Sequence, residues 1–316
     1  MRVVVAGGAG FIGSHLSDHL LARGDEVIAV DNLSTGSPDN IIQLETNENF
    51  NFVEQDIVYG DLHFLNVDAV VNLASPASPP MYLAMPLETL AAGSEGTRHL
   101  LELSELHGAR FIQASTSEVY GDPLVHPQPE DYWGNVNPVG PRSVYDESKR
   151  FSEALVMAHQ RALDSDVGVA RIFNTYGPRL MPHDGRVVSN FITQALRGQD
   201  LTVYGDGDQT RSLCFVDDMV RGLIALLDSS ISGPVNLGNP AEITVLKLAE
   251  TIINTTESLS KVVHLDLPID DPQRRRPDIA LARELLAWEP VVELETGLLA
   301  TIEYFKSRID QHPLFG

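Results

Sequence analysis

Short apolar runs alternate with amphipathic segments along the first half of the chain. Apolar runs bounded by polar residues or glycine predict buried strands, and these runs occupy residues 3–6, 26–30, 52–54, 67–73, 110–114 and 167–173. Apolar residues three or four positions apart predict helices over residues 11–21, 83–107 and 144–163. Because strands alternate with helices, we predict an α/β fold, a doubly wound parallel sheet with helices on both faces.

The pattern becomes less regular after residue 174. It predicts helices over residues 187–196, 216–227, 244–255, 279–287 and 296–308, and strands at residues 201–204 and 235–237. We expect the strand at 235–237 to return to the main sheet. We therefore predict a larger domain, residues 1–173 plus about 212–240, and a smaller α/β domain, about 174–211 plus 241–316, with a ligand in the cleft between them.

The composition is that of a globular protein, with 43% hydrophobic and 21% charged residues. No apolar run approaches the roughly 18 residues of a membrane-spanning helix, and the apolar stretch before Gly7 is too short for a signal peptide. The single cysteine, Cys214, can form no internal disulfide and suits a reducing compartment. We therefore expect a cytoplasmic protein that binds no membrane.

The formal net charge of −22 makes the protein strongly acidic. An acidic surface repels nucleic acid and anionic membranes, so neither is expected as a partner. An anionic ligand would need basic residues within its own site, which makes the arginines informative. His15 and His19 have a spacing that metal ligands use, but no third ligand accompanies them, so we expect no metal.

A glycine-rich segment, GGAGFIG at residues 7–13, follows the first predicted strand and opens the first predicted helix. In that context Gly7 permits a tight turn, Gly10 permits close approach to a pyrophosphate, and Gly13 permits close packing of the helix on the strand. The unpaired N–H groups and the dipole of the helix N-terminus favour the anion. The segment therefore predicts a dinucleotide site in the larger domain.

Asp31 closes the second predicted strand, where a carboxylate accepts hydrogen bonds from the hydroxyls of a ribose. It would repel the 2′-phosphate of NADP, and Asn32 and Leu33 supply no arginine to offset this, so NAD is favoured. Asp56 and Ile57 follow the third predicted strand, where they would meet the adenine. A plain loop turn at Asp56 is an equally good interpretation, and both are retained.

Tyr145 and Lys149 lie four positions apart, on one face of a predicted helix. A tyrosine titrates near ~10, and its pKa must fall by roughly three units, about 4 kcal/mol, before it acts as a base near neutrality. An ammonium about 4 Å away at intermediate dielectric supplies an energy of that size. The spacing therefore predicts a base, Tyr145, activated by Lys149. With the G-x-x-G-x-x-G segment, this pair resembles the extended short-chain dehydrogenase/reductase superfamily.

A polar loop at residues 115–121 follows the fifth predicted strand, at the sheet edge that carries sites in such folds. Thr116 is expected to hydrogen-bond the sugar hydroxyl that is oxidised, and Glu118 to bring a carboxylate to the same ring. Further blocks resemble the UDP-glucuronate decarboxylase family over nearly the whole chain. They are residues 7–16, 72–80, 114–123, 132–138, 171–179, 184–190, 201–211, 235–240 and 270–279.

The resemblance implies a reaction with NAD as cofactor and UDP-glucuronate as substrate. Tyr145 would remove the proton of the C4 hydroxyl while hydride passes from C4 to NAD, and the resulting β-keto acid would lose CO2. After protonation at C5, the hydride would return to C4 and leave UDP-xylose. Glu118 and Arg275 match the family's additional catalytic residues. Arg275 would hold the ring or its carboxylate, and Glu118 would assist proton transfer.

The resemblance also implies which residues bind the two ligands. Those for NAD are Gly7, Gly10, Phe11, Ile12, Gly13, Asp31, Asn32, Thr35, Gly36, Asp56, Ile57, Leu73, Ser75, Tyr145 and Lys149. Those for the nucleotide sugar are Tyr82, Glu118, Asn174, Arg186, Tyr204, Gln209, Arg211 and Arg275. Arginine suits bidentate phosphate contacts, and Tyr204 would stack on uracil.

Three positions depart from related sequences. Gly93 stands where much of the superfamily has asparagine, and Ala91 and His99 replace a lysine and an asparagine of some decarboxylases. We expect all three near the sugar-binding helix.

Rival functions are a nucleotide-sugar 4,6-dehydratase, a 4-epimerase and a catalytically silent NAD-binding scaffold. The helices over residues 83–107 and 144–163 resemble those that pair two subunits in this superfamily, so a homodimer is expected.

Overall fold

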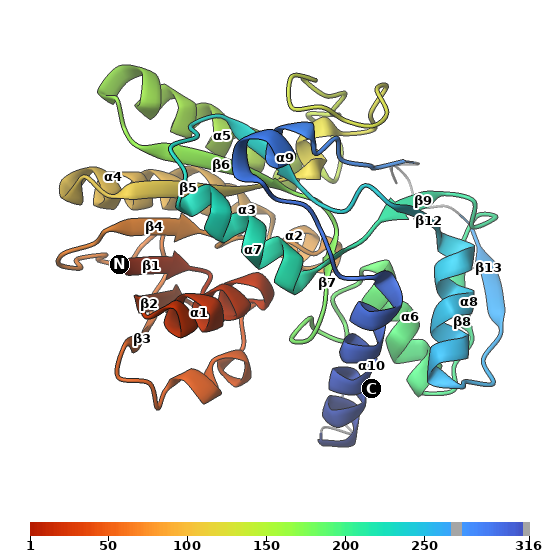
Figure 1. The fold of residues 1–316 in the computed structure, drawn as a ribbon. Helices are drawn as coiled ribbons and strands as arrows, with labels where there is room; N and C mark the ends of the chain where they lie inside the picture. Colours follow the sequence, from red (N-terminus) through yellow and green to blue (C-terminus); the bar gives the residue numbers. More distant parts are fainter. Residues whose placement is uncertain (267–273, 312–316) are drawn as a thin grey trace.

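The computed structural model of the protein describes residues 1–266 and 274–311. Within these residues, a seven-stranded parallel sheet has the strand order β11-β6-β5-β4-β1-β2-β3 (Figure 1). The predicted doubly wound α/β fold is thereby confirmed. The strands are β1 (Arg2–Ala6), β2 (Glu26–Asp31), β3 (Phe50–Glu54), β4 (Ala69–Asn72), β5 (Arg110–Thr116), β6 (Val167–Ile172) and β11 (Pro234–Leu237).

Helices cover both faces of this sheet (Figure 1). On one face, α1 (Phe11–Arg23) packs beside α7 (Val216–Leu227). On the other face lie α4 (Thr97–His107) and α5 (Ser143–Leu163). The helices thus bury the sheet from both sides, as the alternation of strands and helices along the sequence predicts.

The side chains of β1 alternate between two hydrophobic clusters, one on each face of the sheet. Val3 and Val5 pack in the cluster that contains Leu16 of α1. Val4 packs in the cluster that contains Leu100 of α4. Because both faces are buried, the strand is apolar at successive positions rather than at every second one.

The smaller part of the molecule contains α6, α8 and α10, with two-stranded pairings β8–β13, β9–β12 and β7–β10 in the described residues. Its elements and the neighbouring α9 are β7 (Thr175–Tyr176), β8 (Leu201–Tyr204), β9 (Thr210–Ser212), β10 (Cys214–Phe215), β12 (Glu242–Thr244), β13 (Val262–Leu265), α6 (Val187–Leu196), α8 (Val245–Thr256), α9 (Ala280–Leu286) and α10 (Leu294–Gln311). Figure 1 shows this part beside the carboxyl end of the sheet.

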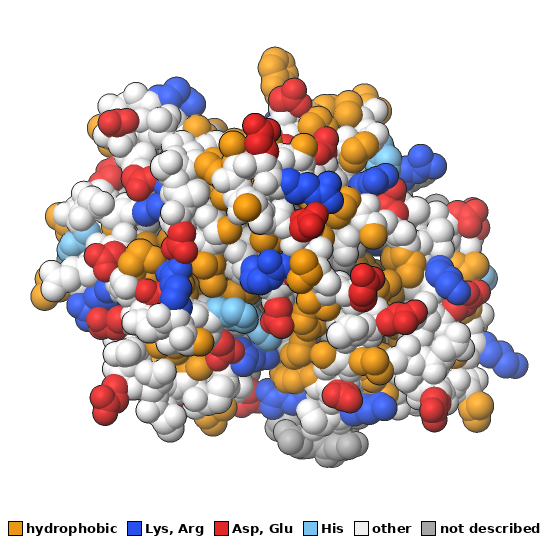
Figure 2. Space-filling model, in the orientation of Figure 1, with side chains coloured by type: hydrophobic (Ala, Val, Ile, Leu, Met, Phe, Trp, Pro, Cys, Tyr) orange, Lys and Arg blue, Asp and Glu red, His pale blue; other side chains and the backbone are white. Residues whose placement is uncertain are grey.

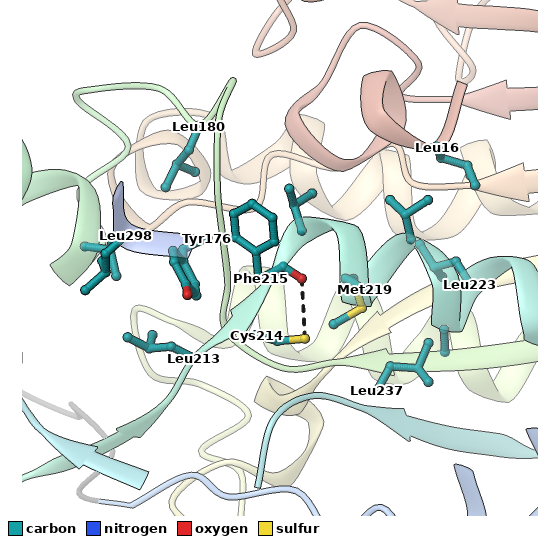
Figure 3. Packing of buried hydrophobic residues seen from close by; sticks show 14 of the residues in the cluster. Leu16, Tyr176, Leu180, Leu213, Cys214, Phe215, Met219, Leu223, Leu237 and Leu298 are labelled. Carbon is teal, nitrogen blue, oxygen red and sulfur yellow. Dashed lines mark hydrogen bonds between the residues drawn. The ribbon is translucent and has the colours of Figure 1, made fainter. Parts of the chain in front are cut away.

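One hydrophobic cluster joins the two parts (Figure 3). It contains Leu16 and Leu223 from the helices on the sheet, and Tyr176 and Leu298 from the smaller part. Cys214 is buried within it, where burial raises the pKa of the thiol. Because the core is continuous, the boundaries of the two domains stay a prediction.

Most predicted elements occur where the sequence pattern places them. The strand at residues 235–237 does return to the main sheet, as β11 paired in parallel with β6. The segment 83–107 is helical but is not one helix, since Pro86 has no N–H group to continue it. This region consists of α2 (Pro79–Ala84), α3 (Pro86–Ala91), the π-helical η3 (Ala92–Gly96) and α4. Short 3-10 turns are η1 (Pro38–Asn40), η2 (Ile42–Leu44) and η4 (Ser117–Tyr120).

Charged side chains of both signs lie on the surface of the protein. On the face shown in Figure 2, Lys and Arg side chains are interspersed with Asp and Glu rather than gathered in one area. Among the described helices, none combines the length and apolar character needed to cross a membrane.

Candidate functional site

A cavity of about 870 Å³ extends from the glycine-rich turn before α1 to Tyr204 at the end of β8. It opens at the carboxyl ends of the parallel strands, where open α/β sheets bind ligands. All predicted site residues line it except Gly36. Gly36 lies against the Asp31 carboxylate instead, since a Cβ atom at residue 36 would come 2.8 Å from both of its oxygens.

The turn between β1 and α1 fits a dinucleotide pyrophosphate. Gly7 has a φ of +77°, and a Cβ atom there would come 2.9 Å from the backbone nitrogen of Ala74. A Cβ atom at Gly13 would collide with the carbonyl oxygen of Gly7. No side chain caps α1 at Gly10, so the first N–H groups of the helix are left for an anion.

Asp31 is held in place by the backbone beside this turn. Its carboxylate accepts hydrogen bonds from the N–H groups of Ala9 (3.0 Å) and Leu33 (2.9 Å). Burial raises the pKa of Asp31, and these backbone hydrogen bonds oppose the rise. Each carboxylate oxygen has a second lone pair with which to accept from a ribose hydroxyl. The geometry therefore fits NAD.

Asp56 forms a local turn and also lines the cavity. One carboxylate oxygen accepts from the N–H of Val58 (2.7 Å), which makes a local turn. The other accepts from the side-chain amide of Asn32 (2.8 Å), and both Asp56 and Asn32 line the cavity. The turn thus holds the residue at the cavity wall, and its contact with the adenine stays a prediction.

Tyr145 is buried on α5 and shares a side-chain hydrogen bond with Thr116 at the end of β5. Burial raises the pKa of Tyr145 to about 12, although Arg186 and Thr116 act to lower it. Lys149 Nζ lies 5.9 Å from the centroid of the Tyr145 ring and donates to the carbonyl oxygen of Ala114 (2.9 Å). Burial lowers the pKa of Lys149 to about 8.

The expectation was that the Lys149 ammonium lowers the pKa of Tyr145 and that a positive nicotinamide ring adds to this, and the structure adds the opposing effect of burial. The Lys149 ammonium donates to a backbone carbonyl, and burial of the phenol raises the pKa of Tyr145 more than the charge of Arg186 lowers it. Sequence spacing places the two residues on one helix face, but it does not report how deeply that face is buried.

Glu118 is held between two arginines. Its Oε2 accepts from Nη2 of Arg142 (2.8 Å), and its Oε1 forms an ion pair with Nη1 of Arg275. Burial alone would raise the pKa of Glu118, but Arg275 and Arg142 together hold it at about 2. Glu118 is therefore ionised with both oxygens engaged, which favours a role in positioning over the proton transfer that the resemblance implies.

Arg142 is the site residue that sequence reasoning missed. It lies at the start of α5, three positions before Tyr145, and lines the cavity. The strongly acidic composition could have pointed to it, because an acidic protein that binds an anionic ligand needs basic residues such as arginine in its site. Of the sequence block 270–279, which carries Arg275, residues 270–273 lie outside the described residues.

The predicted sugar and nucleotide residues lie toward the smaller part. Tyr82 stacks on Tyr145 with ring centroids 5.3 Å apart and planes 7° apart. Arg186 Nη2 donates to the carbonyl oxygen of Ala77 (3.0 Å), and Tyr204 lies at the rim, 40% exposed. The remaining residues of this group that line the cavity are Asn174, Gln209 and Arg211.

The three departures lie in consecutive helical segments, α3, η3 and α4, but they have different neighbours. Ala91 lines the cavity. Gly93 instead packs on α5, where a Cβ atom would come 2.7 Å from the Cβ of Ser148. His99 Nδ1 hydrogen-bonds the carbonyl oxygen of Ile57 (3.0 Å), on the adenine side. Only a small side chain lets the π-helical turn approach α5 so closely, which explains the glycine.

The two histidines with metal-like spacing have other partners. His15 Nε2 hydrogen-bonds the carbonyl oxygen of Pro178 (2.9 Å), and His19 Nδ1 hydrogen-bonds that of His15 (3.0 Å). In the part of the chain that the structure describes, no group of three or more His, Cys, Asp or Glu side chains could hold a metal ion.

Known proteins are similar to this chain in sequence. The model of the NAD dependent epimerase/dehydratase family matches residues 3–238. UDP-glucuronic acid decarboxylase 1 of Danio rerio is 52% identical over 98% of this chain and 73% of that protein. UDP-glucuronic acid decarboxylase 5 of Arabidopsis thaliana is 48% identical over 99% of this chain and 91% of that protein.

Solved structures match over nearly the whole chain. The UDP-glucose 4-epimerase of Thermotoga maritima has a TM-score of 0.89 at 33% identity, covering 98% of this chain and 100% of that one. The UDP-glucuronic acid 4-epimerase of Bacillus cereus, solved with UDP-glucuronic acid and NAD, has a TM-score of 0.88 at 30% identity with the same coverage. With its sequence relatives, its fold and its site geometry in agreement, the chain belongs to the NAD dependent epimerase/dehydratase family and, within it, to the UDP-glucuronic acid decarboxylases.

Proposed function

We propose that this chain decarboxylates UDP-glucuronate to UDP-xylose and CO2, with NAD regenerated in each cycle. The observation that carries the proposal is the grouping of Tyr145, Thr116 and the Glu118–Arg275 ion pair in the cavity that begins at the dinucleotide turn. The names of relatives 48–52% identical to this chain support the substrate.

The residues of the chain bind the sugar and move its proton. Tyr145 and Thr116 share a hydrogen bond, so both hydroxyls can contact the C4 oxygen of a sugar. Bound NAD supplies the oxidation of C4 and its reversal. Once C4 is a ketone, the C5 carboxylate lies β to it, and the electrons of the breaking C–C bond pass into the ketone as CO2 leaves. C5 then takes up a proton.

Tyr145 needs additional positive charge before it can act as the base. Burial raises its pKa to about 12, so near neutrality the phenol is protonated. The positive nicotinamide ring and the Lys149 ammonium are the charges that would lower this pKa in the complete complex. The conditions for proton removal thus depend on cofactor and enzyme together.

The function is tested by product analysis. We expect the purified protein with UDP-glucuronate and NAD to release UDP-xylose and CO2 in equal amounts, with no net NADH, as followed by proton NMR and CO2 trapping. An epimerised UDP-uronic acid without CO2 would establish the 4-epimerase instead, and a dehydrated sugar would establish the dehydratase. Binding of NAD without any turnover would support the silent scaffold.

We also propose that the protein is a homodimer joined through α3 and α5. These two helices pack against each other. They expose Leu87, Leu90 and Phe151, which are 75%, 38% and 51% accessible. Large apolar side chains gathered on adjoining helices indicate a contact surface.

Light scattering tests the dimer. We expect twice the chain mass for the unsubstituted protein and a single chain mass after Leu87→Glu and Phe151→Glu together, because a buried interface does not tolerate unpaired carboxylates. The matched control is Leu259→Glu, at a side chain 97% exposed outside these helices, which should leave the mass unchanged. A single chain mass for the unsubstituted protein would remove the proposal.

A further inference from the structure

Arg142 has donors that the described protein does not use. The one hydrogen bond of its side chain among the described residues runs from Nη2 to Glu118 (2.8 Å). A guanidinium carries five N–H donors, and the Arg142 side chain is 22% exposed where it lines the cavity. Arg275, on the opposite side of Glu118, is only 6% exposed and is tied by Nη2 to the carbonyl oxygen of Gly121 (3.1 Å). Arg142 is therefore the more accessible of the two cations.

The site carries more positive than negative charge. One carboxylate, that of Glu118, is shared between Arg142 and Arg275. Asp146 is also close, but burial and the charge of Glu118 raise its pKa to about 7, so its carboxylate is neutralised in part near neutrality. A second anion is needed to balance the two guanidiniums.

Three buried polar atoms beside these arginines lack partners among the described residues. Two belong to donors, the hydroxyl of Tyr82, on a side chain that is 2% exposed, and Nε of Arg275, and the third is Oδ1 of Asp146. Tyr82 and Arg275 line the same cavity as Arg142. A buried donor without an acceptor is costly, so the arrangement is that of a site completed by an acceptor from outside the chain.

We propose that Arg142, assisted by the Tyr82 hydroxyl, binds the C5 carboxylate of the substrate and selects UDP-glucuronate over UDP-sugars whose sugar carries no carboxylate. This inference rests on the proposed function. Arginine and carboxylate have complementary planar geometry, and their hydrogen bonds are stronger than neutral ones. Glu118, engaged on its other oxygen by Arg275, stays in place and orients the guanidinium of Arg142.

The proposal assigns Arg142 to binding rather than to bond breaking. A cation that holds the carboxylate stabilises the bound substrate, but the negative charge moves from the carboxylate to the C4 oxygen as neutral CO2 departs. Its removal should therefore raise KM for UDP-glucuronate more than it lowers kcat. If Arg142 had a merely structural role, its substitution would weaken the binding of all UDP-sugars alike.

Binding is measured in a Tyr145→Phe background, which prevents turnover during titration. With NAD saturating, calorimetry compares UDP-glucuronate with UDP-xylose, which differs by the carboxylate. Adding Arg142→Met should weaken the binding of UDP-glucuronate on the order of 10- to 100-fold. The affinity for UDP-xylose should change little. Arg161→Met, an exposed arginine in the last turn of the same helix, is the matched control and should change neither. Equal losses for both ligands, or no loss for either, would overturn the proposal.

Steady-state kinetics with Tyr145 intact provide the second test. Arg142→Met should raise KM with a smaller change in kcat, and Arg142→Lys should recover part of the loss because it retains the charge without the planar fork. A fall in kcat at unchanged KM would contradict the proposal. Failure of the proposed function would be recognised separately, because the unsubstituted protein would then make no UDP-xylose, whereas calorimetry would still report whether Arg142 recognises the carboxylate.

Discussion

Tyr145→Phe is expected to reduce kcat by on the order of 10²–10⁴-fold while binding of NAD and of the UDP-sugar persists. The substitution removes the Tyr145 hydroxyl, which we assign to accept the C4 proton and which shares a hydrogen bond with Thr116. Phenylalanine keeps the ring that stacks 5.3 Å from Tyr82, so packing around α5 should survive. The measurement is the rate of UDP-xylose formation, with NAD affinity determined in parallel.

Tyr304→Phe is the matched control for this loss. It removes a hydroxyl in α10 that accepts from Nε of Arg308 (3.2 Å) and does not line the cavity. We expect it to retain full turnover. If Tyr145→Phe were as active as this control, Tyr145 would not be the base, and proton removal would have to be assigned to another group.

Glu118→Gln is expected to lower both stability and turnover. Glutamine cannot balance the charges of Arg142 and Arg275, so two guanidiniums would face each other, one of them in a residue that is only 5% exposed. Removing one partner of a buried ion pair costs about 3–5 kcal/mol. Thermal and urea unfolding would measure the loss. Glu102→Gln, in an exposed pair with Arg98, should cost about 0.5 kcal/mol or less.

The stability difference between Glu118→Gln and the unsubstituted protein should depend on pH. The two arginines hold the pKa of folded Glu118 at about 2, below its ordinary value of 4.5. A carboxyl with a lowered folded pKa stabilises the protein fully above its unfolded pKa and loses this contribution as the pH falls toward the folded pKa. The difference should therefore be greatest above about pH 5 and shrink between about pH 4 and 2. A difference that stays constant over this range would show that Glu118 is not held ionised by its arginines.

Local sequence patterns predicted the parts of the site that neighbouring residues build. The turn at residues 7–13 lies between an apolar run and an amphipathic segment, and the structure has β1 and α1 there. Tyr145 and Lys149 share a helix face because four residues make about one helical turn. Thr116 and Glu118 follow a strand, and strand ends in a parallel sheet meet at one edge. Such features need only the order of residues along the chain.

Other features of the same region depend on contacts that the order of residues does not specify. The π-helical turn at η3 packs against α5, where Ser148 leaves no room for a side chain at Gly93. These two segments are far apart along the chain and meet only in the folded structure.

The sequence by itself determined the fold class, the dinucleotide turn and most of the residues that line the cavity, because periodicity and motif spacing act over a few turns of chain. Only the tertiary structure decided the protonation of these residues. Glu118 is ionised because Arg142 and Arg275, from two other segments, meet on its two oxygens. Tyr145 keeps its proton because its helix face is buried. A pKa depends on burial and on distances between charges, and these exist only once the distant segments have packed together.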